Sequence, residues 1–104
     1  MSMPVEVLWY PQARTDLLDI YVVIGIENPV AAERIYDALE MRAHQLSQHP
    51  RLGPRRPDIQ TSTRVLVEGP YLILYETRPD TDEGTVTEVA IVRVIDGRRD
   101  LARI

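Results

Sequence analysis

The sequence contains no cysteine, and all twelve of its basic residues are arginine rather than lysine. Without cysteine the chain can form no disulfide and no thiolate metal site, and it has no cysteine nucleophile. Arginine stays protonated at ordinary pH, so it binds anions but can hardly act as a general base. These absences exclude several kinds of catalysis and leave anion binding as the chemistry that the basic residues can perform.

Long apolar runs are absent too. No stretch approaches the roughly 18 consecutive apolar residues of a membrane span. The N-terminus, MSMPVE, lacks the basic and apolar regions of a signal peptide. We therefore expect a cytoplasmic protein with no membrane partner. A chain of 104 residues with 44% hydrophobic and 27% charged residues is typical of one globular domain, here residues 1–104.

The most apolar stretch is Val86–Ile95, and it organises the predicted fold. Its alternation predicts an inner strand with two apolar faces. One face carries Val89, Ile91 and Ile95, and the other carries Ala90, Val92 and Val94. Arg93 is a charged exception near the end of the strand. The chain has helices for one face but little material for the other, so we expect a partner to help to cover it.

Two helices are predicted before this strand. Proline is favoured at the first position of a helix, so Pro11 begins a helix that runs to about Glu27. Asn28 is a good N-cap, and the second helix runs from Pro29 to about Gln48. The connection between them is short, which predicts an antiparallel helical hairpin.

The first helix has a wider apolar surface than one core stripe needs. The additional residues are Leu18, Val22, Val23 and Ile26. Large exposed apolar patches on small proteins usually mark interaction sites. The alternative is that these side chains are simply packed into an overfilled core.

The remaining apolar segments read as strands. They are Val5–Trp9, Thr63–Glu68 and Tyr71–Arg78. The last two are joined through Gly69 and Pro70, and with Val86–Ile95 they form an antiparallel meander. The order β-α-α-β-β-β predicts an α+β fold, in which the helical hairpin packs on one face of an antiparallel sheet.

Most polar residues give no sign of catalysis. His44 and His49 are five positions apart, which does not place them on one helix face as a metal pair requires. The carboxylate pairs Asp16 with Asp19 and Asp37 with Glu40 read as solvated helix faces. The five glycines are isolated and form no phosphate-binding loop. We therefore expect no cofactor, no metal and no catalytic residue.

Arginine gives a stronger signal, in two regions. The loop after the helices contains Arg51, Arg55 and Arg56, and the end of the organising strand and the tail contain Arg93, Arg98, Arg99 and Arg103. A rigid strand followed by a glycine presents the next side chains well, which favours a contact surface for another macromolecule. The alternative is surface solvation, with Asp96 and Asp100 as local partners.

Residues 7–21, VLWYPQARTDLLDIY, resemble the opening of the ParE branch of the RelE/ParE toxin superfamily, in which a strand ends in aromatic-x-Pro and a helix follows with Ala-x-x-Asp-Leu-x-x-Ile. Further matches follow in the same order: Asn28-Pro29 with Ala31-Ala32, Leu46 with His49-Pro50 and Leu52-Gly53, Arg64 with Leu66, Tyr71 with Ile73 and Tyr75, and Ile95 with Gly97-Arg98-Arg99-Asp100. The resemblance covers nearly the whole chain.

This resemblance implies a bacterial type II toxin that inhibits DNA gyrase by binding and is neutralised by a cognate ParD-like antitoxin in a hetero-oligomer. The alternative is a RelE-like, ribosome-dependent mRNA endoribonuclease. RelE-type cleavage relies on lysines and arginines with a C-terminal tyrosine, whereas this chain has no lysine and no tyrosine after Tyr75. That departure favours a non-enzymatic inhibitor, for which we expect no direct nucleic-acid binding.

The target-binding and antitoxin-binding hypotheses each predict site residues. For the target, Arg98 and Arg99 are the first candidates, with Arg93 and Arg103 second, because a guanidinium offers five donors without any change of protonation. For the antitoxin, Leu18 and Val22 are the candidates.

Overall fold

The computed structural model describes residues 4–99. Its elements follow the predicted order. They are β1 (Glu6–Trp9), α1 (Pro11–Gly25), α2 (Pro29–His44), the 3-10 turn η1 (Gln45–Ser47), β2 (Arg64–Glu68), β3 (Tyr71–Arg78) and β4 (Glu88–Asp96). The α+β class and the helical hairpin are therefore confirmed.

The four strands form one sheet in the order β1-β4-β3-β2. β3 runs antiparallel to both β2 and β4, as the predicted meander requires. β1 runs parallel to β4, with Val7 beside Val89, so the sheet is mixed rather than wholly antiparallel. A parallel pair needs a long connection, and both helices and the β2–β3 hairpin lie between these strands in the sequence. β4 is thus an inner strand, as predicted.

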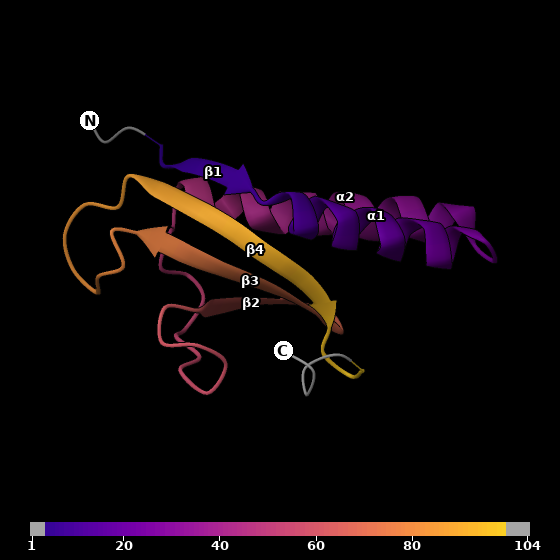
Figure 1. Ribbon diagram of the computed structural model, residues 1–104. Coiled ribbons are helices and arrows are strands. Elements are labelled where there is room, and N and C mark those ends of the chain that lie inside the picture. Colours follow the sequence, from indigo (N-terminus) through magenta and orange to yellow (C-terminus); the bar gives the residue numbers. More distant parts are fainter. Residues whose placement is uncertain (1–3, 100–104) are drawn as a thin grey trace.

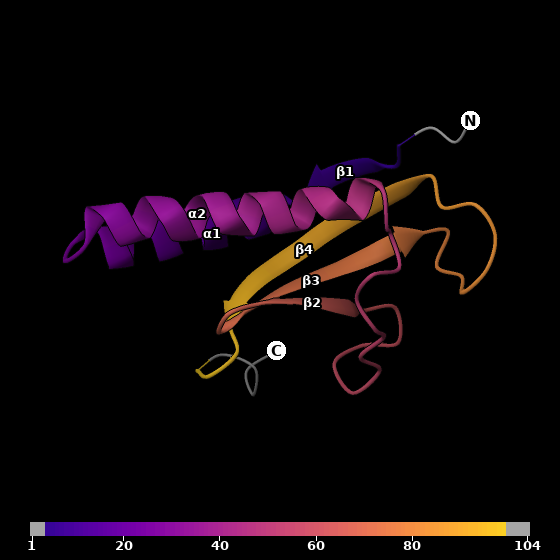
Figure 2. The same cartoon turned by 180° about the vertical axis from the view of Figure 1, so that it is seen from behind.

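Both helices lie on one face of the sheet, as Figures 1 and 2 show from opposite sides. The core between the layers contains Leu17 from α1, Leu39 from α2 and Ile91 from β4, each at most 1% exposed. The first turns form as the sequence predicts, since Pro11 and Pro29 begin the helices and Asn28 Oδ1 accepts the N–H of Ala31 at 3.1 Å. None of the helices in residues 4–99 is long and apolar enough to cross a membrane.

The opposite face of the sheet has a smaller apolar cluster. Val65, Leu74 and Ile95 are each about 3% exposed, and Ile59 and Leu72 pack against them. Ile59 comes from the loop between η1 and β2, so the chain itself covers this part of the face. The expectation that a partner helps to cover this face is wrong for these residues.

Ile95 lies on a different face from the one predicted. Tyr75 pairs with Ile91, whereas Leu74 pairs with Arg93, so Val92 is an extra residue in β4. Such a bulge shifts the alternation of side chains beyond it. Val89 and Ile91 therefore face the helices, while Ile95 joins the cluster on the other side.

Candidate functional site

α1 exposes an apolar stripe on the side that faces away from the sheet. Leu18 is 55% exposed and Val22 52%, and Ile26, one further turn along, is 78% exposed. The spacing of four places the three side chains in one row, which we call the α1 stripe. The alternative that these residues fill an overpacked core is therefore wrong. Leu18 and Val22 are available to a partner.

A second feature of α1 is a cleft of about 260 Å³ between this helix and the end of β4, which we call the α1–β4 cleft. Its apolar wall comes from Ile20, Val23 and Ile24 of α1. Arg93 and Arg99 also line it. The structure thus brings two of the predicted target residues beside the helix that carries the α1 stripe.

β1 pairs with β4 only as far as Ile91, and beyond that point the Asp16 side chain of α1 accepts a backbone hydrogen bond from β4. Tyr10 donates its N–H to the carbonyl of Ile91 at 2.9 Å, and the chain then turns into α1. Further along β4, the N–H of Val94 donates to Asp16 Oδ2 at 3.0 Å. Arg93 donates to the same carboxylate, from Nε at 2.7 Å and from Nη2 at 3.1 Å.

Asp16 is only 9% exposed, so the prediction of a solvated helix face is wrong for this residue. The sequence gives no sign of this role, because the partners lie on a strand that is distant in the sequence. Arg93, a second-choice target residue, is held in a structural ion pair by Asp16 and keeps 40% of its side chain exposed.

Arg98 is paired locally. Its Nε and Nη2 donate to the two carboxylate oxygens of Asp96 at 3.1 and 2.9 Å, and its backbone N–H also binds Asp96 at 2.9 Å. The hydrogen bond from Arg98 lowers the pKa of Asp96. Even so, 69% of the Arg98 side chain is exposed. Arg98 is therefore paired with Asp96 and still exposes most of its side chain.

Arg99 is exposed, and no carboxylate in the described part of the chain pairs with its side chain. Arg103 lies outside the described residues. Of the four predicted target residues, the structure therefore places Arg93, Arg98 and Arg99 at one end of the sheet.

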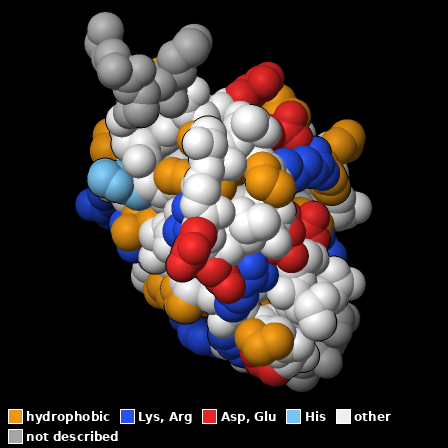
Figure 3. All heavy atoms as spheres, turned by 90° about the vertical axis from the view of Figure 1, so that its left-hand side faces the viewer, with side chains coloured by type: hydrophobic (Ala, Val, Ile, Leu, Met, Phe, Trp, Pro, Cys, Tyr) orange, Lys and Arg blue, Asp and Glu red, His pale blue; other side chains and the backbone are white. Residues whose placement is uncertain are grey.

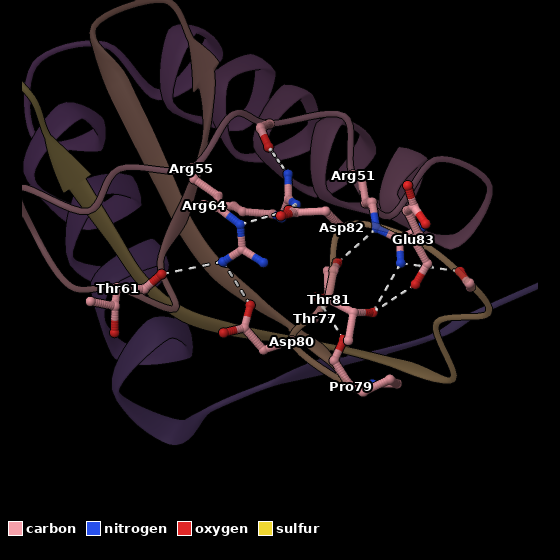
Figure 4. A network of polar contacts seen from close by, with 12 residues as sticks. Arg51, Arg55, Thr61, Arg64, Thr77, Pro79, Asp80, Thr81, Asp82 and Glu83 are labelled. Atoms are coloured by element: carbon pink, nitrogen blue, oxygen red, sulfur yellow. Dashed lines mark hydrogen bonds and ion pairs between the residues drawn. The ribbon is translucent and has the colours of Figure 1, made fainter.

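The arginines of the other region hold a loop in place (Figure 4). Arg55 binds Asp82 and Asp80, both at 2.8 Å, and Arg64 also binds Asp82 at 3.0 Å. Arg51 donates to the carbonyl of Thr81 at 2.9 Å. Hydrogen bonding by Arg55 lowers the pKa of Asp82. These contacts join the segment before β2 to the loop between β3 and β4.

This end of the molecule is consequently not a purely basic surface. Arg56 is bound by Asp58 at 2.7 Å, in addition to the pairs of Arg55. Figure 3 views this end and shows acidic and basic side chains next to one another. In Figure 1 these loops lie at the left, whereas β4 runs to the right. Arg98 and Arg99, which we call the tail arginines, follow the end of β4. The two arginine regions therefore lie at opposite ends of the sheet.

Beside this loop, Gly53 fits against the backbone of β2. Its N–H donates to the hydroxyl of Tyr75 at 2.9 Å, and its carbonyl accepts Arg64 Nη1 at 3.0 Å. Burial raises the pKa of Tyr75. The buried side chains of Arg64 and Tyr75 therefore hold the Gly53 backbone in place. As for metals, no group of three or more His, Asp or Glu residues in positions 4–99 is arranged to hold an ion.

Comparison with known proteins gives a consistent result. The model of a family described as the ParE toxin of the type II toxin-antitoxin system parDE matches residues 7–101. Toxin ParE3 of Caulobacter vibrioides is 34% identical over 64 residues, which are 62% of this chain and 57% of that protein. The match thus spans little more than half the length of this curated relative.

Two solved structures share the fold. A chain of the chromosomal ParDE toxin-antitoxin system from P. aeruginosa has a TM-score of 0.73 at 21% identity, over 91% of this chain and 98% of the other. A chain of the toxin-antitoxin complex RelBE2 from Mycobacterium tuberculosis has a TM-score of 0.62 at 31% identity, over 89% of this chain and 98% of the other. The α+β fold is therefore the fold found in ParDE and RelBE systems.

Proposed function

The chain belongs to the ParE toxin family of type II toxin-antitoxin systems, and from this we propose that it inhibits DNA gyrase by binding and is neutralised by a ParD-like antitoxin. The observation that carries the proposal is the family match over residues 7–101. It is supported by surfaces suited to binding, namely the exposed α1 stripe and the tail arginines.

Inhibition by binding needs a fixed surface rather than a residue that gains or loses a proton. Arg98 and Arg99 supply such a surface, because guanidinium groups donate several hydrogen bonds and keep their charge. Arg98 has its anion partner, Asp96, beside it. Gyrase would therefore compete with Asp96 for Arg98 and would meet Arg99 with no such competitor among residues 4–99.

A RelE-like endoribonuclease is the second candidate, and the likeness to the RelBE2 chain favours keeping it. Its weakness is chemical. Cleavage of RNA by attack of the 2′-hydroxyl requires groups that accept and donate protons. The chain has no lysine, and its arginines rarely lose a proton, which leaves His44 and His49 as the only basic side chains that could transfer one.

Two purified reactions separate the candidates. The toxin is added to a gyrase supercoiling reaction and, in parallel, to a reconstituted translation reaction. We expect loss of supercoiling with normal translation. Cleaved mRNA with unaffected gyrase would instead establish the endoribonuclease. Co-expression with the product of the adjacent reading frame should restore growth if that product is the antitoxin.

A further inference from the structure

The α1–β4 cleft lies between the two surfaces used in the proposed function. Val23, which lines the cleft, directly follows Val22 of the α1 stripe in the same helix and is 63% exposed. Arg99, which also lines it, directly follows Arg98 in the tail. A segment that lies along α1 can therefore reach the tail arginines through this cleft without crossing the rest of the protein.

The cleft has an apolar wall and a charge on each side. Its volume of about 260 Å³ exceeds the roughly 150 Å³ in which a protein cavity holds benzene, so a large apolar side chain fits. Within positions 4–99, neither Asp19 on the helix side nor Arg99 on the tail side has an ion pair. These two charges are therefore the ones that an incoming segment can pair with.

The other charges of the cleft are already balanced. Asp16 is paired with Arg93, and Asp96 is paired with Arg98. The local charge is consequently close to zero. Nucleic acid needs an excess of positive charge to bind, so it fits this cleft poorly.

We propose that the antitoxin places one large apolar side chain in the α1–β4 cleft and a neighbouring carboxylate against Arg99. This inference rests on the proposed function and adds the mode of neutralisation: the antitoxin covers Arg99 directly and leaves the fold of the toxin unchanged. Matching charge also predicts a basic residue of the antitoxin beside Asp19. The apolar anchor supplies affinity and the paired charges supply register.

The test uses the full toxin and the product of the adjacent reading frame, with affinity measured by calorimetry. Val23→Ser should weaken the complex by about tenfold, because it removes apolar area from the cleft. Val30→Ser is the matched control, since Val30 is 73% exposed on α2 and does not line the cleft. The control should change affinity by less than about twofold.

The charge is tested in the same way. Arg99→Glu should weaken the complex by about tenfold, with a smaller loss at high salt. Arg34→Glu, an exposed arginine of α2 outside the cleft, is its control. The thermal unfolding curves of all four variants should match that of the wild type, which separates loss of contact from loss of fold.

Each alternative result has a distinct meaning. If the wild-type pair binds and Val23→Ser equals Val30→Ser, the cleft inference is wrong while the proposed function stands. If the wild-type pair does not bind at all, the cleft inference and the proposed neutralisation both fail, whereas gyrase inhibition is decided by the supercoiling reaction. If the toxin alone dimerises and Val23→Ser makes it monomeric, the cleft holds a second copy. If bound antitoxin still allows gyrase to bind the toxin, neutralisation is not by covering Arg99.

Discussion

Arg93 and Asp16 are 77 positions apart in the sequence, yet Arg93 Nε donates to Asp16 Oδ2 at 2.7 Å. The same carboxylate accepts the N–H of Val94. The buried Asp16 thus accepts a backbone hydrogen bond of β4 and holds Arg93, a predicted target residue, against α1.

Replacing Asp16 with alanine should lower the free energy of unfolding by about 2 kcal/mol, because the N–H of Val94 loses its acceptor and the ion pair between Asp16 and Arg93 is lost. Water can partly solvate Arg93, which is 40% exposed, so a larger loss is not expected. Urea denaturation measures the change. Asp19→Ala is the control and should have an effect below about 0.5 kcal/mol, since Asp19 is exposed. Equal effects would mean that Asp16 is an ordinary surface carboxylate.

Local signals account for the part of the fold that was predicted. Pro11, Asn28 and Pro29 act on their own neighbours, so helix starts can be read from the sequence alone. The role of Asp16 depends on contact with β4, and the face of Ile95 depends on a bulge at Val92. Neither has a local signature, which is why both predictions were wrong.

In the candidate site, too, features that depend on one helix could be predicted, whereas features that depend on contacts between distant segments could not. Exposure of Leu18 and Val22 follows from the period of one helix, because a single helix cannot turn both sides toward the core. The α1–β4 cleft needs two elements to be placed side by side. The pairing of Arg55 and Arg64 with Asp82 likewise joins two distant segments. The sequence located the arginines but could not separate those that hold a loop from those available for binding.

Gly53→Ala should destabilise the fold by about 1–3 kcal/mol, because the added Cβ would lie 2.4 Å from the carbonyl oxygen of Val65. The shift needed to relieve this clash would also disturb the hydrogen bond to Tyr75. Thermal and urea unfolding measure the loss. Gly25→Ala is the matched control, since its Cβ would lie 3.6 Å from Ala32 Cβ in ordinary contact. It should be neutral or stabilising by up to about 1 kcal/mol.

Asp82→Asn should make stability less sensitive to acid. Hydrogen bonding by Arg55 keeps the pKa of Asp82 below its ordinary value of 3.8. A carboxyl whose pKa is lower in the folded state stabilises the fold above its unfolded pKa, and this contribution disappears as pH falls through the folded pKa. The variant should therefore have a lower Tm than the wild type at pH 7, with the difference closing below pH 3.8.

Scanning calorimetry across this pH range measures the difference in Tm. Glu83→Gln, a neighbouring loop acid with no ion pair among residues 4–99, serves as the control and should follow the wild type at every pH. A constant gap between Asp82→Asn and the wild type down to pH 2 would contradict the assignment.

Substituting Leu18 and Val22 with serine should weaken the antitoxin complex far more than it unfolds the toxin. Both side chains are more than half exposed, so the folded toxin loses little, whereas a partner that buries them loses two apolar contacts. We expect roughly a hundredfold weaker binding. The control is Met41→Ser with Val67→Ser, which changes two similarly exposed apolar side chains away from the α1 stripe. Unchanged affinity in the Leu18 and Val22 variant would remove this stripe from the interface.

Replacing Arg98 and Arg99 with alanine should abolish growth inhibition in cells while leaving thermal stability nearly intact. Exposed charges contribute only about 0–1 kcal/mol to folding, and the local pair of Arg98 with Asp96 is of this kind. Growth curves, the supercoiling assay and thermal unfolding are the measurements. The antitoxin affinity of the double variant should fall only slightly further than that of Arg99→Ala alone, because Arg98 does not line the α1–β4 cleft but neutralises Asp96, which does. A double variant that stays fully toxic would show that the tail is a solvated end and not the target surface.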